Sequence, residues 1–154
     1  MEDINPIFEE FAGAFAGEVE YPDDVAFPEK LDRGRLDYSL ESLHVVDAYL
    51  DYLYEHNQGI GEEEWKKTVM RGGAYVGEVV RRNARETWMW IDYNDYMPQN
   101  PDLQQMIPDR TAATCAFLCR EDGSMWMPLN KVARFIEEGP EQNTHYAASV
   151  ECGG

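Results

Sequence analysis

The sequence has few cysteines, few basic residues and no long apolar run. Its 154 residues include 3 cysteines, and only 13 Lys and Arg stand against 30 Asp and Glu. No stretch approaches the roughly 18 uninterrupted apolar residues of a membrane span, and no basic region precedes an apolar run as in a signal peptide. We therefore expect a cytoplasmic protein without a membrane partner.

The shortage of Lys and Arg leaves a formal net charge of −17 at pH 7, and acidic residues occur along most of the chain. Proteins bind nucleic acids mainly by neutralising phosphates with Lys and Arg, so we do not expect a nucleic-acid partner. An acidic surface would instead attract a basic protein. The simpler alternative is that the acidity serves solubility alone.

The cysteine pattern predicts neither a disulfide nor a metal site. Cys115 and Cys119 fall within one predicted strand, where they would lie about 13 Å apart, which is too far for a disulfide. Together with Cys152 they are expected to be free thiols. The sequence contains no H-E-x-x-H or C-x-x-C motif and no phosphate-binding glycine pattern, so we predict no metal and no cofactor.

Apolar residues, by contrast, are plentiful. They make up 44% of the chain, with 4 Trp, 9 Tyr and 6 Phe, which is enough to form a core. We expect one domain over residues 1–154, because this length is typical of a single domain. Its oligomeric state does not follow from the sequence.

Apolar residues at helical spacing predict four helices, over residues 3–15, 38–56, 62–84 and 129–138. The clearest stripe comprises Leu36, Leu40, Leu43, Val46, Leu50 and Leu53, which share one helix face. The second and third helices are expected to form an antiparallel hairpin. In the third helix Gly73 and Gly77 lie four residues apart, and we expect close packing against another backbone to offset their helix-breaking cost.

Aromatic and β-branched residues predict strands over residues 87–93, 112–120 and 124–127, with a fourth at 144–151. Asp122 and Gly123 favour a tight turn that joins two of them in a hairpin. The predicted fold class is therefore α+β. A helical hairpin packs on a small, mainly antiparallel sheet of three to four strands, with additional N-terminal and C-terminal helices.

Residues 94–110 show little periodicity and are interpreted as a long loop. Loops of this length inside a compact domain are uncommon and often functional. Candidate binding residues at its start are Tyr93, Asp95, Tyr96 and Met97. The alternative is a proline-rich crossover that only carries the chain over the sheet.

Three ionisable residues are candidates for acid or base catalysis: Glu78, His44 and Asp92. Glu78 borders the buried face of a helix, where a carboxylate can act as a general base. It also lies three and four residues before Arg81 and Arg82, which is the spacing of a structural ion pair. No Ser, Cys or Thr stands in the sequence context of a catalytic triad.

One segment resembles a group of small uncharacterised bacterial proteins. Residues 72–79 read G-G-A-Y-V-G-E-V and are followed by the tryptophan strand Trp88-Met89-Trp90, after a leucine-rich helix. The resemblance spans Leu36 to Trp90. It implies a bacterial cytosolic protein related to toxin-immunity modules, and it carries no catalytic residue.

These observations support three functional hypotheses. The first is an acidic protein-binding module, in particular an immunity-like inhibitor of a basic protein partner. The second is a small hydrolase or ligand-binding enzyme with a cleft beside residues 94–110. The third is a structural or regulatory subunit that self-associates through exposed aromatic surface.

Overall fold

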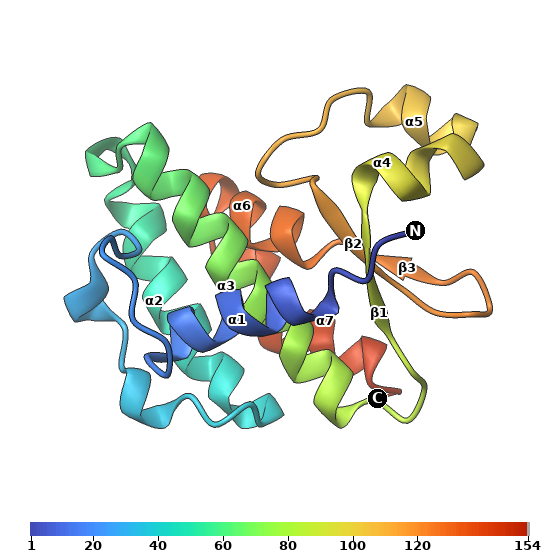
Figure 1. The fold of residues 1–154 in the computed structure, drawn as a ribbon. Coiled ribbons are helices and arrows are strands. Elements are labelled where there is room, and N and C mark those ends of the chain that lie inside the picture. Colours follow the sequence, from blue (N-terminus) through green and yellow to red (C-terminus); the bar gives the residue numbers. More distant parts are fainter. Residues whose placement is uncertain (154) are drawn as a thin grey trace.

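The computed structural model describes residues 1–153, and over this part of the chain it has an α+β fold. Seven α-helices accompany a three-stranded antiparallel sheet, which lies toward one side of the molecule (Figure 1). None of these seven helices combines the length and the apolar character needed to cross a membrane.

The helices differ widely in length. They are α1 (Asn5–Ala16), α2 (Leu43–Glu55), α3 (Glu62–Asn83), α4 (Tyr93–Tyr96), α5 (Pro101–Met106), α6 (Pro128–Glu138) and α7 (Thr144–Glu151). The strands are β1 (Met89–Asp92), β2 (Ala116–Cys119) and β3 (Met125–Trp126). The helices predicted at the N-terminus, in the two central segments and at 129–138 are thus confirmed as α1, α2, α3 and α6.

Helix α2 begins later than its apolar stripe suggests. Leu40–Ser42 forms a 3-10 turn, in which the Ser39 hydroxyl accepts a hydrogen bond from the backbone N–H of Ser42 at 3.1 Å. From Leu43 onward the stripe is fully buried, as its spacing predicts. Each of the two central helices packs mainly on other helices, α3 on α1 and α6 and α2 on α6 and α7, rather than on its predicted hairpin partner.

The two helical glycines allow close packing of α3, as expected. A Cβ built on Gly73 would lie 2.6 Å from the backbone Cα of Leu129, at the start of α6. A Cβ on Gly77 would overlap the indole ring of Trp90 in β1 and would lie 3.3 Å from Leu118 in β2. The glycines therefore seat α3 against the sheet on one side and against α6 on another.

The sheet has the order β1-β2-β3, and both neighbouring pairs are antiparallel. Trp90 faces Leu118, which in turn faces Trp126 on the third strand. Gly123 adopts φ of +93° in the turn between β2 and β3, so the predicted hairpin is confirmed.

Residues 144–151 form a helix, and the prediction of an edge strand there was wrong. The Asn143 side chain caps this helix, α7. Asp47 of α2 accepts hydrogen bonds from the backbone N–H groups of Thr144 and His145, at 2.8 and 3.2 Å. A carboxylate at a helix N-terminus favours the helix electrostatically, and here it comes from a residue far away in the sequence.

Residues 94–110 are not one irregular loop, which corrects a second prediction. They contain most of α4, a 3-10 turn and α5. Pro98 and Pro101 fall in the first turns of these short elements, where a missing N–H costs nothing. Tyr93 and Met97 lie four residues apart and are both buried against the sheet.

Candidate functional site

Glu78, the first predicted catalytic residue, has a structural role. Its side chain is buried, and its Oε2 accepts a hydrogen bond from the indole Nε1 of Trp90 at 2.9 Å. The same oxygen pairs with Nη1 of Arg81 at 2.8 Å, so the predicted ion pair is present. Arg82 instead stacks over the ring of Tyr38, with the guanidinium carbon 3.5 Å from the ring centroid.

The other two catalytic candidates lie elsewhere and engage different partners. Asp92 caps α4 by accepting a hydrogen bond from the backbone N–H of Asn94 at 2.8 Å, and its carboxylate also pairs with Arg110 at 2.8 Å. His44 lies on the exposed face of α2 beside His145. Glu78 lines one of the five best-defined hollows of the described surface, whereas His44 and Asp92 line none of these five. None of these five hollows therefore brings two of the three candidates together.

The four predicted binding residues divide into two pairs. Tyr93 and Met97 are buried, and the Tyr93 hydroxyl donates a hydrogen bond to the carbonyl of Ile107 at 2.7 Å. Asp95 and Tyr96 remain partly exposed and line a hollow of about 230 Å³.

Cys119 also lines this hollow, but its thiol is not activated. Burial raises the pKa of Cys119 to about 12, so the side chain is a neutral thiol near pH 7. A nucleophilic cysteine needs a lowered pKa, because the thiolate is the reactive form. The hollow beside residues 94–110 thus contains two predicted binding residues without a catalytic partner.

The charge distribution is the strongest functional feature, and it is less even than the sequence first suggests. Residues 1–64 contain 18 acidic and 3 basic side chains, a net charge of −15. Residues 65–154 contain 12 acidic and 10 basic side chains, a net charge of −2. We call residues 1–64 the acidic segment. Counting charge by segment finds this asymmetry, whereas the total alone conceals it.

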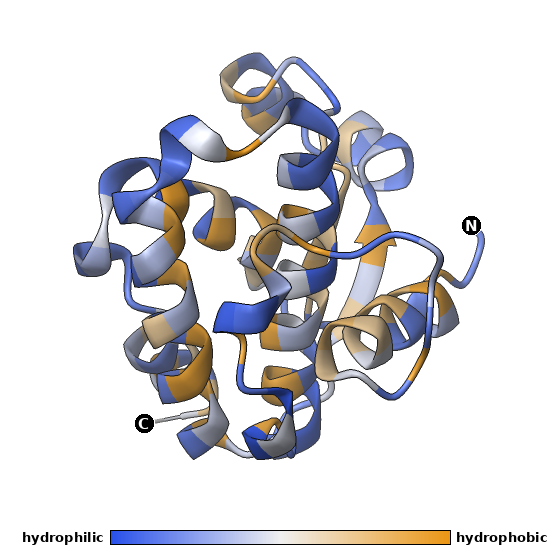
Figure 2. Ribbon diagram, turned by 90° about the vertical axis from the view of Figure 1, so that its left-hand side faces the viewer, coloured by the Kyte–Doolittle hydropathy of each residue, from blue (hydrophilic) through white to orange (hydrophobic). Residues whose placement is uncertain are grey.

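The fold gathers most of the acidic segment on one side of the molecule. The connection after α1 and helix α2 lie on the side away from α4 and α5, and α1 runs from this side toward the sheet (Figure 1). Seen from that side, the connection between α1 and α2 is mostly hydrophilic (Figure 2). Charge that is concentrated in the sequence is therefore also concentrated in space.

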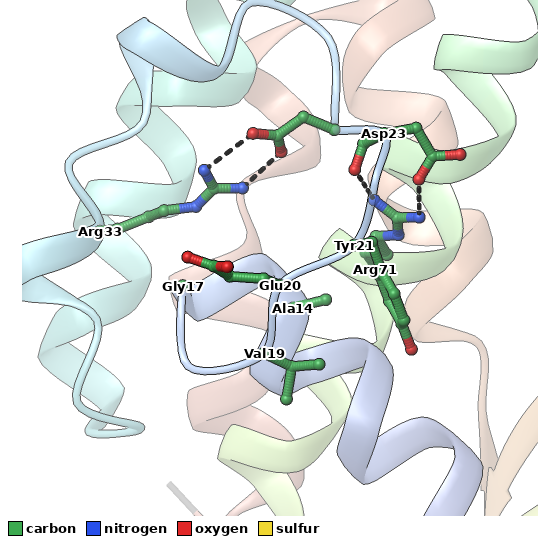
Figure 3. A pocket seen from close by; sticks show the side chains of 9 residues that line it. Ala14, Gly17, Val19, Glu20, Tyr21, Asp23, Arg33 and Arg71 are labelled. Atoms are coloured by element: carbon green, nitrogen blue, oxygen red, sulfur yellow. Dashed lines mark hydrogen bonds and ion pairs between the residues drawn. The ribbon is translucent and has the colours of Figure 1, made fainter.

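A hollow of about 390 Å³ lies on this side (Figure 3). The end of α1, the connection that follows it and Arg71 of α3 form its walls. We call it the acidic hollow, and its lining residues are Ala14, Gly17, Val19, Glu20, Tyr21, Asp23, Asp24, Arg33 and Arg71.

One wall of the acidic hollow is held by Arg33. Its guanidinium makes a two-pronged pair with Asp24, at 2.6 and 3.1 Å, and its Nε donates to the carbonyl of Phe15 at 2.9 Å. A planar pair of this kind fixes both side chains in orientation. Arg33 thus ties the connection to the end of α1.

The opposite wall is held by Arg71. Its two Nη atoms donate to the carbonyl and the carboxylate of Asp23, at 3.2 and 2.7 Å, and its guanidinium lies 4.6 Å from the Tyr21 ring centroid. Lys67 also pairs with Asp23, at 2.8 Å. Hydrogen bonds from Arg71 and Lys67 lower the pKa of Asp23 to about 2, so this carboxylate is ionised at physiological pH.

Both arginines of the acidic hollow are therefore neutralised by aspartates, whereas Glu20 is not paired. No hydrogen bond or ion pair reaches the Glu20 carboxylate from any residue between 1 and 153. Figure 3 shows it beneath the guanidinium of Arg33, at the floor between the two walls. The hollow thus has a fixed frame and one carboxylate free to meet a cation.

No family model matches this chain, and comparison with curated proteins and with solved structures finds no match.

Proposed function

We propose that this chain is an acidic protein-binding module that docks a basic protein partner at the acidic hollow. The observation that carries the proposal is the net charge of −15 on residues 1–64, gathered on one side of the molecule. The rigid frame of the hollow and the unpaired Glu20 supply a place where one cationic side chain can bind.

The chemistry of the hollow suits an arginine or lysine of the partner. Such a side chain would enter beside Glu20 without displacing the aspartates, which are already held by Arg33 and Arg71. The surrounding carboxylates would accelerate association by long-range attraction, an effect that salt weakens within a Debye length of about 10 Å at 0.1 M. Nucleic acid and anionic membranes would be repelled by the same field.

The particular form that we propose is an immunity-like inhibitor in the bacterial cytosol, which neutralises a basic toxin domain by covering its surface. The resemblance of residues 36–90 to small bacterial proteins supports this form. A hydrolytic cleft beside residues 94–110 lacks comparable support, because Glu78, His44 and Asp92 engage separate partners.

The test is binding measured with a matched pair of charge reversals. A partner retained from native lysate at low salt is identified, purified and titrated against the wild-type chain. We expect Glu20→Lys to weaken binding on the order of tenfold or more, through loss of a direct charge pair. Glu121→Lys serves as the control. Glu121 is exposed in the hairpin turn outside the acidic segment, and its substitution changes the net charge by the same amount.

The proposal requires both an effect of salt and an effect of position. If raising the salt concentration leaves the affinity unchanged, the acidic segment does not drive binding. If Glu20→Lys and Glu121→Lys weaken binding equally, overall charge rather than the hollow is responsible, and the docking site is wrong.

A further inference from the structure

Two histidines and a glutamate meet on the surface at a place separate from the acidic hollow. The rings of His44 and His145 stack with centroids 3.9 Å apart and an angle of 24° between their planes. The Nε2 atoms of both lie near Glu41, His44 at 3.7 Å and His145 at 3.8 Å from its carboxylate oxygens. One donor atom from each residue lies within 4.8 Å of the others.

The fold brings these residues together from two distant parts of the chain. Glu41 lies in the 3-10 turn that leads into α2, and His44 follows three residues later on the same face. His145 is the second residue of α7. Asp47, one turn beyond His44, accepts the backbone N–H groups of Thr144 and His145 and so fixes the start of α7 beside α2.

The ring nitrogens of this pair are free for another ligand. Neither His44 nor His145 makes a ring hydrogen bond within residues 1–153 at normal distance, and their approach to Glu41 exceeds 3.5 Å. The third histidine differs, because Nδ1 of His56 lies 2.9 Å from the carbonyl oxygen of Tyr52 and its ring stacks on the Tyr52 ring. His56 therefore serves for comparison as a histidine whose ring already has a hydrogen-bond partner.

We propose that Glu41, His44 and His145 form a binding site for a divalent transition-metal ion, with Zn²⁺ the natural probe. Two imidazole nitrogens and one carboxylate oxygen are ligands that Zn²⁺ accepts in tetrahedral sites with a fourth position open. Imidazole also favours such ions over Mg²⁺ and Ca²⁺, which prefer oxygen ligands.

To bind one ion, the His44 ring must turn out of its stack on His145, so that the lone pairs of both rings point at the metal. With metal–ligand bonds of about 2.0–2.2 Å, the donors of a tetrahedral site stand about 3.4 Å apart. The donor atoms now lie within 4.8 Å of one another, so no pair needs to approach by more than about 1.4 Å. Glu41 and His44 have side-chain exposures of 82% and 55% and can rotate. His145 is 25% exposed and starts from a helix end held by Asp47, so it provides the fixed side of the site.

Zn²⁺ titration of the whole chain by calorimetry tests the proposal, with folding checked by circular dichroism. We expect one ion per wild-type chain. His44→Ala and His145→Ala should each weaken binding at least about tenfold, as removing even a supporting residue of a metal site does. His56→Ala is the matched control and should bind like wild type.

Two further variants separate this site from other binding modes. Glu41→Gln should also weaken binding, whereas a triple Cys→Ser variant at positions 115, 119 and 152 should not, because those thiols are not ligands here. Three results would each overturn the site. Zn²⁺ affinity could fall as much in His56→Ala as in the other histidine variants, it could stay unchanged in His44→Ala and His145→Ala, or it could fall only in the cysteine variant. None of these changes touches Glu20, so the docking proposal is tested independently.

Discussion

The sheet separates two cores of unequal size. On one face Trp90 and Leu118 join the main core, to which α1, α2, α3 and α6 contribute. On the other face Phe117 and Cys119 join a small cluster with Tyr93 and Met97 beneath α4 and α5. Alternate residues of the same strands serve the two cores, because side chains along a strand point to opposite faces.

The two cores are covered by very different helices. The main core lies beneath α3, a helix of 22 residues, and its longest neighbours, whereas the small cluster is covered by α4 and α5, of 4 and 6 residues. Helices this short gain almost no stability from their own hydrogen bonds and depend on packing. We infer that the region around the small cluster opens more readily than the helical body.

The largest effect is expected from adding a methyl group where α3 packs directly on the sheet. In Gly77→Ala the new methyl group would overlap the Trp90 indole, which cannot retreat because it stacks on Phe8 at 4.4 Å and donates to Glu78. We expect a loss of about 3 kcal/mol in the free energy of unfolding, measured by urea denaturation.

Gly72→Ala provides the control within the same helix. A Cβ there would lie 3.3 Å from the Phe15 ring, a contact that a small shift relieves. The gain in helix propensity, about 1 kcal/mol, should then offset most of the cost. A similar loss at both glycines would show that helix α3, rather than its seat on the sheet, is being disturbed.

The second prediction compares the two cores directly. Leu53→Ala in α2 and Met97→Ala beside β2 each remove a fully buried side chain, and each should cost about 2–3 kcal/mol locally. If the small cluster opens by itself, Met97→Ala should speed hydrogen exchange in residues 93–106 while the amides of α3 stay protected. Leu53→Ala should instead speed exchange throughout the main core.

Uniform acceleration in both variants would mean that the two cores unfold as one unit. Native-state exchange followed by NMR distinguishes the outcomes residue by residue. The comparison also bears on the predicted binding residues, since Tyr93 and Met97 would become accessible only when this region opens.

Sequence periodicity predicted the elements that carry their own signal. The leucine stripe of α2, the glycines of α3 and the turn at Gly123 each predict a local structure that is present in the fold. Residues 144–151, by contrast, were predicted as an edge strand. Their helix is favoured by Asp47, whose position relative to Thr144 no local pattern reveals.

In the candidate sites, too, contacts within one helix could be predicted, whereas contacts between residues far apart in the sequence could not. The ion pair of Glu78 with Arg81 could be predicted, because both residues lie on one helix. The hydrogen bond from Trp90 could not, since it depends on how α3 meets the sheet. His44 and His145 lie 101 positions apart, so no spacing motif could indicate that their rings stack.

The third prediction concerns Glu78, the buried anion at the junction between α3 and β1. Glu78→Gln keeps an oxygen to accept from Trp90 but leaves the guanidinium of Arg81 without its nearest counter-charge. Arg81 is partly exposed and also pairs with Glu9, so we expect a moderate loss of about 1–2 kcal/mol. Glu9→Gln, which removes the exposed partner, should cost less. Equal losses would indicate that burial of Glu78 adds nothing to the pair.

The smallest effect is expected for the loss of folding stability at low pH. The pKa of Asp23 is lowered to about 2 by hydrogen bonds from Arg71 and Lys67, and that of Asp122 to about 2 chiefly by Arg120. A carboxyl group whose pKa is lowered on folding stabilises the folded state above its ordinary pKa of about 4, and this contribution is lost as the pH falls through the folded value.

The two aspartates should nevertheless differ, because their partners lie at different distances along the chain. Asp23 and Arg71 are 48 residues apart and meet only in the folded protein, whereas Asp122 and Arg120 are neighbours in one turn and can also meet in the unfolded chain. Asp23→Asn should therefore remove part of the stability difference between pH 5 and pH 2, and Asp122→Asn should remove less. Urea denaturation of both variants at a series of pH values measures this, and equal effects would mean that the frame of the acidic hollow adds no stability of its own.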